Sequence, residues 1–306
     1  MNEHNSNIPA YAAITDWLNF TFQYSAKPDP LRELFLGIFA VLGPKFGPAV
    51  ETGRGLHGYT RCFSLGDTGA LFAIGGQKGT AFISMPGEAC SLIEDWQSLA
   101  DYFGGNLRAR ISRWDGAVDD YLGVHSIDVA VQKYLQGDFS TAGNRPSINQ
   151  IGNWLVPDGT GRTFYIGKRR NGKMLRIYEK GQQLGQLWSP WVRWELELHN
   201  RDRVVPWEVV LQPGRYFVGA YPNALDWVQA EMSRVATIQK QSLIGYVHLM
   251  ECASQAYGAL LNVMQNVEGS PEEVLKKLVR PGSPRRLRHP YQDRAGELIK
   301  GAICHE

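Results

Sequence analysis

The sequence predicts an α+β protein with an antiparallel sheet-based core, flanking helices and a helical C-terminal segment. Short β-rich runs bounded by glycines and turns occupy residues 58–85, and alternating runs recur over residues 108–200. Apolar spacing then becomes helical from about Ala224 through Asn266. We therefore expect a sheet-based domain over residues 1–223 and a helical segment with a basic tail over residues 224–306.

The N-terminal third mixes helices with short strands. Asp29-Pro30 precedes LRELFLGIFAVLG, which indicates a capped helix with proline at its first position. The runs at 58–65, 70–75 and 80–85 are separated by glycines and predict an antiparallel meander. Residues 88–105 have helical periodicity and end at a glycine pair.

The middle of the chain is richer in strands, and the C-terminal part holds one more helix signal. Alternating residues at 108–120, 173–180 and 191–200 predict strands, and Asn171-Gly172 predicts a hairpin turn. Ser270-Pro271-Glu272-Glu273 provides a capping box for a short helix after the long one.

Three of the expected strands combine an apolar face with a face that carries both signs of charge. Because strand side chains alternate between faces, spacing by two shows which residues converge. The charged faces hold Arg113, Asp115 and Asp119 on the first strand, Met174, Arg176, Tyr178 and Lys180 on the second, and Arg193, Glu195, Glu197 and His199 on the third. If these strands are neighbours in one sheet, their charged faces line a common groove.

Basic residues are concentrated in two stretches, although the net charge of the chain is only +2. Residues 162–180 and 276–294 each hold seven basic residues against one acidic residue. Such stripes are typical of proteins that bind phosphate backbones, and a solvated surface and a loose tail are the alternative. We expect DNA contacts from Arg113, Lys168, Arg169, Arg170, Lys173 and Arg193.

Composition excludes several classes of protein. No apolar run approaches the roughly 20 residues that a membrane span needs, and the N-terminus lacks the pattern of a secretion signal. The four cysteines have no CxxC spacing, which argues against a zinc site and fits a reducing cytosol. We therefore expect a cytoplasmic protein that does not use membranes.

A tyrosine among cations and beside carboxylates suits attack on a phosphodiester. Tyr178 would be the nucleophile, and Arg176 and Lys180 would hold the phosphate and lower the pKa of the phenol. Asp115, Glu195 and Glu197 offer an oxygen-rich site for Mg²⁺ or Mn²⁺. His199 joins this site, transfers protons or is simply hydrogen-bonded. The competing interpretation is a polar sheet face that only meets water.

The same stretches resemble a known family. RWDGAVDD at 113–120, TFYIGKRRNGKMLRIYEKGQQ at 163–183 and WVRWELELH at 191–199 resemble the three motifs of the replication initiators of filamentous phages and rolling-circle plasmids. The resemblance covers roughly residues 11–230, including the opening ITDWLNFTF. It implies a site-specific, metal-dependent DNA nickase–ligase in which Tyr178 forms a 5′-phosphotyrosine, with Asp115 and Glu195 at the metal-binding positions.

The resemblance also implies partners and leaves rivals open. Origin DNA, double-stranded and supercoiled or single-stranded, would be the substrate, and a host helicase and a second copy of the chain are possible partners. A conjugative relaxase would use the same chemistry at a transfer origin. A DNA-binding regulator without cleavage activity would need the basic stripes but not Asp115 or Glu195. Core packing is the default role for Trp154, Trp188, Trp191, Trp194 and Trp207, and stacking on unpaired bases is the alternative.

Overall fold

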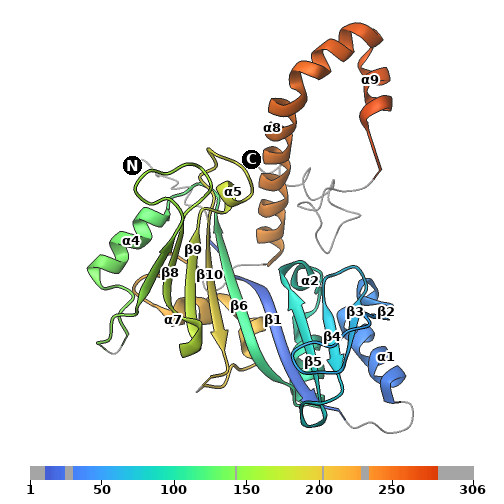
Figure 1. The fold of residues 1–306 in the computed structure, drawn as a ribbon, viewed down its shortest axis with the longest axis vertical. Coiled ribbons are helices and arrows are strands. Elements are labelled where there is room, and N and C mark those ends of the chain that lie inside the picture. Colours follow the sequence, from blue (N-terminus) through green and yellow to red (C-terminus); the bar gives the residue numbers. More distant parts are fainter. Residues whose placement is uncertain (1–10, 25–29, 142, 202, 229–233, 282–306) are drawn as a thin grey trace, which may run out of the picture. The chain divides into compact units, whose positions relative to one another are not determined.

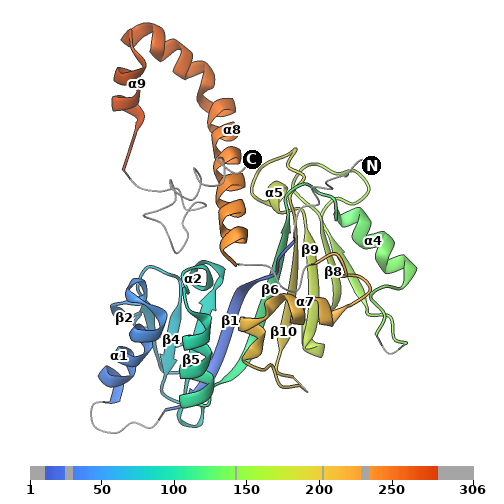
Figure 2. The ribbon, with the colours of Figure 1, turned by 180° about the vertical axis from the view of Figure 1, so that it is seen from behind.

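The computed structural model describes the chain except residues 1–10, 25–29, 142, 202, 229–233 and 282–306. The chain divides into two compact units, residues 1–233 and residues 234–306, and the boundary predicted from sequence lay at 223/224. Most of the predicted basic tail, from residue 282 onward, lies outside the described residues. The first unit is the α+β domain, drawn from blue to orange-yellow in Figures 1 and 2.

In the described part of the first unit, ten strands form one antiparallel sheet. Its order is β2-β3-β4-β5-β1-β6-β10-β9-β8-β7, so that β1 and β6 join an N-terminal half to a C-terminal half. The strands are β1 (Ile14–Gln23), β2 (Ala49–Glu51), β3 (Arg61–Leu65), β4 (Leu71–Ile74), β5 (Thr80–Pro86), β6 (Arg110–Asp120), β7 (Ile148–Ile151), β8 (Thr163–Lys168), β9 (Lys173–Tyr178) and β10 (Val192–His199). The predicted α+β class and the meander of β3, β4 and β5 are confirmed.

Seven α-helices belong to the described part of this unit. They are α1 (Pro30–Leu42), α2 (Gly87–Ser91), α3 (Trp96–Leu99), α4 (Ile127–Gln136), α5 (Lys180–Gln183), α6 (Glu208–Leu211) and α7 (Pro213–Ala220). α4 packs on β8 and β9, and α7 packs on β1 and β6. The core contains fully buried aromatic side chains such as Phe20, Trp114 and Trp194. On their strands, these side chains lie on the face opposite the charged residues.

The helix predicted at 88–105 is broken into three pieces. α2 ends at Ser91, Asp95 caps α3 by accepting from the amide of Ser98, and a π-helical turn follows at Ala100–Asn106. The apolar period is real, but the cap at Asp95 restarts the helix. The predicted hairpin at Asn171-Gly172 is confirmed, with Gly172 in the left-handed region (φ 73°) after the short turn Arg169–Asn171.

The long C-terminal helix begins ten residues later than its apolar spacing predicts. α8 spans Arg234–Glu268, whereas Ala224, Leu225 and Val228 lie in turns and are buried in the core of the first unit. Their apolar character therefore serves that core. The predicted capping box is confirmed, because Ser270 accepts from the amide of Glu273 at the start of α9 (Pro271–Leu278). No described helix is both long and apolar enough to cross a membrane.

Candidate active site

The three strands that carry charges of both signs on one face are neighbours in the sheet. This is the condition under which the sequence predicted a common groove. β10 lies between β6 and β9, and all three are antiparallel. Arg193 pairs with Asp119 on one side and with Tyr178 on the other, and Glu195 pairs with Arg176. The charged side chains thus form rows across one face of the sheet, opposite the helices.

Tyr178 ends β9 and is only 5% exposed. Its hydroxyl donates a hydrogen bond to Glu195 Oε2 at 3.1 Å. The guanidinium of Arg176 and the ammonium of Lys180 lie 5.0 and 5.5 Å from the ring centroid. Burial raises the pKa of the phenol well above its ordinary value, although Arg193 and Arg176 act in the opposite direction. The predicted lowering of this pKa is therefore wrong, because loss of solvent outweighs the nearby cations.

Glu195 links the tyrosine to Arg176. Its Oε1 atom lies 2.5 Å from Nη2 of Arg176, while its other oxygen accepts from Tyr178. The Nε–H of Arg176 is buried and has no acceptor among the described residues. One guanidinium thus holds the carboxylate beside the phenol and keeps a donor unused.

Arg193 forms a buried bridge instead of the DNA contact expected from sequence. Its guanidinium donates to both oxygens of Asp119, at 2.8 and 2.6 Å, and to Asp16 Oδ1 at 3.0 Å. Its side chain is only 14% exposed, and pairing with the two aspartates raises the pKa of the guanidinium although burial lowers it. Both carboxylates use its donors in this structure, whereas the sequence predicted that Arg193 contacts the DNA backbone.

Asp16 belongs to this site and sequence reasoning missed it. In the pairing of β1 with β6, Thr15 faces Gly116 and Trp17 faces Asp115, so Asp16 is the extra residue of a β-bulge. The bulge turns Asp16 and Trp17 to the charged face together, which strict alternation forbids. Burial raises the pKa of Asp16, while Arg193 lowers it. The sequence signal that could have indicated Asp16 is an acidic residue directly before the aromatic Trp17 in the first strand.

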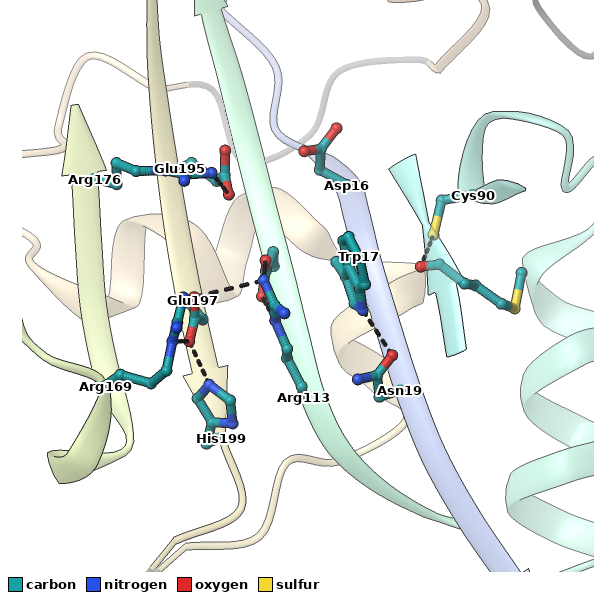
Figure 3. A network of polar contacts seen from close by, with 12 residues as sticks. Asp16, Trp17, Asn19, Cys90, Arg113, Arg169, Arg176, Glu195, Glu197 and His199 are labelled. Atoms are coloured by element: carbon teal, nitrogen blue, oxygen red, sulfur yellow. Dashed lines mark hydrogen bonds and ion pairs between the residues drawn. The ribbon is translucent and has the colours of Figure 1, made fainter. Parts of the chain in front are cut away.

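A second network lies lower on the same face (Figure 3). Nε and Nη2 of Arg113 donate to the two oxygens of Asp115, at 2.9 and 2.5 Å. The guanidinium carbon of Arg113 lies 4.5 Å from the centroid of the Trp17 ring. Glu197 is bound by Arg169 at 2.5 and 2.8 Å and by His199. Arg113 therefore contacts protein carboxylates, in place of the DNA backbone contact expected for it.

The two carboxylates of this network have opposite pKa shifts. Burial raises the pKa of Asp115 to about 7, because it outweighs the hydrogen bonds from Arg113. Burial also acts to raise the pKa of Glu197, but hydrogen bonds from His199 and Arg169 prevail and lower it to about 2. The number and strength of the cationic partners decide the sign of each shift.

The predicted metal ligands do not share a centre. Glu195 is turned to Tyr178 and Arg176, Glu197 to Arg169 and His199, and Asp115 to Arg113. Within the described ranges, no group of three or more acidic, histidine or cysteine side chains is placed to hold a metal ion. With arginines supplying the positive charge, this donor set does not fit one Mg²⁺ or Mn²⁺ ion held by all three carboxylates.

The hairpin between β8 and β9 carries the exposed cations. Lys168, Arg169 and Arg170 lie at its tip, and Arg201 and Arg203 donate to the carbonyls of Arg170 and Asn171, both at 3.4 Å. We call these five residues the basic tip. Sequence reasoning missed Arg201 and Arg203, because their place beside the hairpin follows from the pairing of β10 with β9.

Lys173 is not part of the basic tip. Its Nζ donates to the carbonyl of Ala220 at 2.8 Å and lies 3.9 Å from the centroid of Tyr221, on the helix-covered face. Burial lowers its pKa to about 8. The period of β9 places Lys173 with Leu175 and not with Arg176, so Lys173 lies on the face opposite the rows of charged side chains, whereas the sequence predicted that it contacts DNA.

Comparisons with known proteins show the family and the fold of the chain. A family model described as "Replication initiation factor" matches residues 109–279, more than half of the chain. A solved structure titled as that of the rolling circle replication initiator protein from Geobacillus stearothermophilus is 26% identical, with a TM-score of 0.56 over 74% of this chain and 88% of that one. No curated protein matches. With its β6, β9 and β10 motifs inside the matched region, the chain belongs to the replication initiation factor family, and its fold is similar to that of a rolling circle replication initiator protein.

Proposed function

We propose that this protein is a site-specific single-strand DNA endonuclease and strand transferase that opens a replication origin. Tyr178 is the nucleophile. The observation that carries the proposal is the hydrogen bond from its hydroxyl to Glu195, in a face that also holds Arg176 and Lys180. A phenol, a carboxylate and two cations are the groups that in-line attack on a phosphodiester needs.

Glu195 acts as the general base in this mechanism. Because burial raises the pKa of Tyr178, the phenol does not ionise by itself near neutral pH. The carboxylate 3.1 Å away takes the proton as the phenol oxygen bonds to phosphorus. The bond from phosphorus to the 3′ oxygen breaks, and that oxygen leaves and is protonated. A later 3′-hydroxyl attacks the 5′-phosphotyrosine, which reforms the DNA bond and returns the phenol.

Arg176 stabilises the charge that develops on the phosphoryl oxygens. The Arg176 side chain is 34% exposed, so its guanidinium presents positive charge to a phosphate although its Nε–H is buried. Lys180 adds positive charge from the start of α5. A requirement for Mg²⁺ or Mn²⁺ is a separate prediction, and none of these steps depends on it.

The basic tip supplies contacts to the DNA backbone away from the reacting phosphate. Its five cations are exposed, in contrast to the buried Arg193 and the inward-turned Lys173. When exposed arginine and lysine side chains bind DNA phosphates, counterions are released from the DNA, and this makes binding steeply salt-dependent. Origin DNA, both duplex and single-stranded, is therefore the proposed partner, and a host helicase or a second copy remain predictions.

The test compares two neighbouring tyrosines on the same face. Tyr165 pairs with Arg176 across the β8–β9 ladder and provides the matched control for Tyr178. On supercoiled plasmid carrying the origin, Tyr178→Phe should abolish nicking and covalent attachment, while Tyr165→Phe should nick normally. Glu195→Gln should slow nicking by roughly 10²–10⁴-fold, the usual contribution of a general base.

Several outcomes would decide against the proposal or refine it. Undiminished nicking by Tyr178→Phe would remove Tyr178 as the nucleophile. Tight origin binding without a nick, in Mg²⁺ and in Mn²⁺, would favour the regulator. Nicking that persists in EDTA would show that the arginines replace the metal, and loss of nicking in EDTA would confirm the predicted metal requirement.

A further inference from the structure

Two loops, residues 152–161 and 184–190, lie at the Tyr178 end of the sheet (Figures 1 and 2). They expose large apolar side chains. The loops touch, because a Cβ added to Gly159 would lie 2.3 Å from Cδ2 of Leu187. Trp188 is 94% exposed and Leu155 is 98% exposed. We call the exposed apolar residues of the two loops the apolar rim, which consists of Leu155, Val156, Leu187 and Trp188.

The rim is fastened to the surroundings of Tyr178. The amide of Gly181, in the α5 turn just after the tyrosine, donates to the carbonyl of Trp191 at 3.2 Å, and the amide of Gln186 donates to the carbonyl of Gly181 at 3.0 Å. The indole of Trp191 donates to Asp119 at 2.7 Å. Both ends of the loop that carries Trp188 are therefore anchored beside the site, and Trp188 is presented outward from a fixed base.

Two observations indicate that this loop binds something. Single exposed apolar residues are ordinary, but a cluster with an almost fully exposed tryptophan is typical of a binding surface. The side-chain amide of Gln186 also has both polar atoms buried without a hydrogen-bond partner in the described part of the chain. A buried unpaired amide costs free energy, and a ligand whose polar atoms bond to it would remove that cost.

The cations at the inner edge of the rim identify the occupant. Arg176 and Lys180 lie around Tyr178, and Lys180 directly precedes Gly181, whose carbonyl accepts from the amide of Gln186 in the loop of Trp188. A ligand on the rim would therefore lie on the side of the site where the proposed mechanism places a phosphate. A second protein would match the apolar side chains but not these cations. An unpaired nucleotide matches both, since its base has an apolar face and its backbone is anionic.

We propose that the apolar rim, through Trp188, stacks on unpaired bases that flank the scissile phosphate and holds the origin strand open for Tyr178. This inference rests on the proposed function. Duplex DNA keeps its bases stacked on one another and offers none to the rim. The rim therefore selects melted or extruded DNA, whereas the basic tip binds backbone in either form.

Binding should be measured in the Tyr178→Phe background, so that no cleavage occurs, with two origin oligonucleotides. One is a perfect duplex, and the other has mismatched bases around the scissile phosphate. Trp188→Ala should weaken binding to the mismatched DNA about tenfold or more, by loss of base stacking, and leave duplex binding unchanged. Trp188→Phe should keep most of the affinity. Leu36→Ala, which removes an exposed apolar side chain on α1, is the matched control.

Three results would overturn the inference. The first is an unchanged affinity of Trp188→Ala for mismatched DNA, and the second is an equal loss of affinity for both DNAs. The third is a lower sedimentation coefficient of Trp188→Ala than of Tyr178→Phe without DNA, which would make the rim a contact between copies of the chain. Failure of the proposed function would differ, because the wild-type chain would then nick neither DNA even if binding depended on Trp188. A Trp188→Ala chain with Tyr178 intact should need a higher protein concentration than the wild type to nick mismatched DNA.

Discussion

The phenol of Tyr178 has three cations around it, and its pKa is nevertheless raised. Loss of water around a buried hydroxyl costs the anion more than these cations return, since Arg176 and Arg193 are already paired with carboxylates. The same competition acts on the pKa values of Asp115 and Glu197. At the residue scale, chemistry therefore depends on how many donors each carboxylate receives, which a count of charges along the chain does not reveal.

The raised pKa of Asp115 predicts a pH dependence of stability. Burial moves this pKa from 3.8 to about 7, so the folded state holds the proton more tightly than the unfolded state. The stabilising contribution is fully present below about pH 4 and is lost as pH rises through about 7. Asp115→Asn should remove this fall in the free energy of unfolding, as measured by urea denaturation across the pH range.

Glu197 provides the control for that measurement, because its shift has the opposite sign. Its pKa is lowered from 4.5 to about 2, so its contribution is present above about pH 4.5 and is lost as pH falls through about 2. Glu197→Gln should therefore alter stability relative to the wild type by a constant amount between about pH 5 and pH 7. If Asp115→Asn parallels the wild-type curve over this range, the carboxyl titrates normally and the explanation by burial fails.

At the element scale, the β9 hairpin separates cations that look equivalent in sequence. Lys173 packs on Tyr221 beneath the sheet, and Arg170 is exposed in the basic tip. Lys173→Met should lower the free energy of unfolding by about 1–3 kcal/mol, because the carbonyl of Ala220 loses its donor. It should leave DNA affinity unchanged. Thermal or urea denaturation and a salt titration of DNA binding measure the two effects.

Arg170→Ala should show the reverse pattern. An exposed substitution changes stability by no more than about 0.5 kcal/mol. Loss of one phosphate contact reduces the slope of log affinity against log salt by about 1. Equal salt slopes for Arg170→Ala and Lys173→Met would contradict the assignment of the basic tip to DNA.

Strand alternation predicted the elements of the site well. The period of two along β6, β9 and β10 placed Asp115, Tyr178 and Glu195 on one face, because no bulge interrupts the pairing of β10 with β6 or with β9. It failed for Asp16, where a bulge in the β1–β6 pairing adds a residue. It also failed for the start of α8, because residues 224–228 are apolar to fill a core and not to continue a helix. Tertiary packing decides these cases.

At the scale of the whole molecule, the first unit contains every residue of the candidate site and its own core. A chain that ends at Ser233 should therefore unfold cooperatively and should nick a single-stranded origin oligonucleotide at a rate near that of the full chain. Circular dichroism during heating and a nicking time course measure both properties. Non-cooperative melting of this shortened chain would show that residues 234–306 are needed for the fold of the first unit.

The central place of β1 in the sheet has a consequence for synthesis on the ribosome. β1 is made first, but its partners β5 and β6 follow some 60 to 100 residues later, and β10, which carries Glu195, lies beyond β6. Contacts between such distant segments close slowly, because the loop entropy must be overcome first. The nascent chain therefore has no complete Tyr178 site until about two thirds of it has been made, so on the proposed mechanism a translation product that stops before Glu195 should not cut DNA.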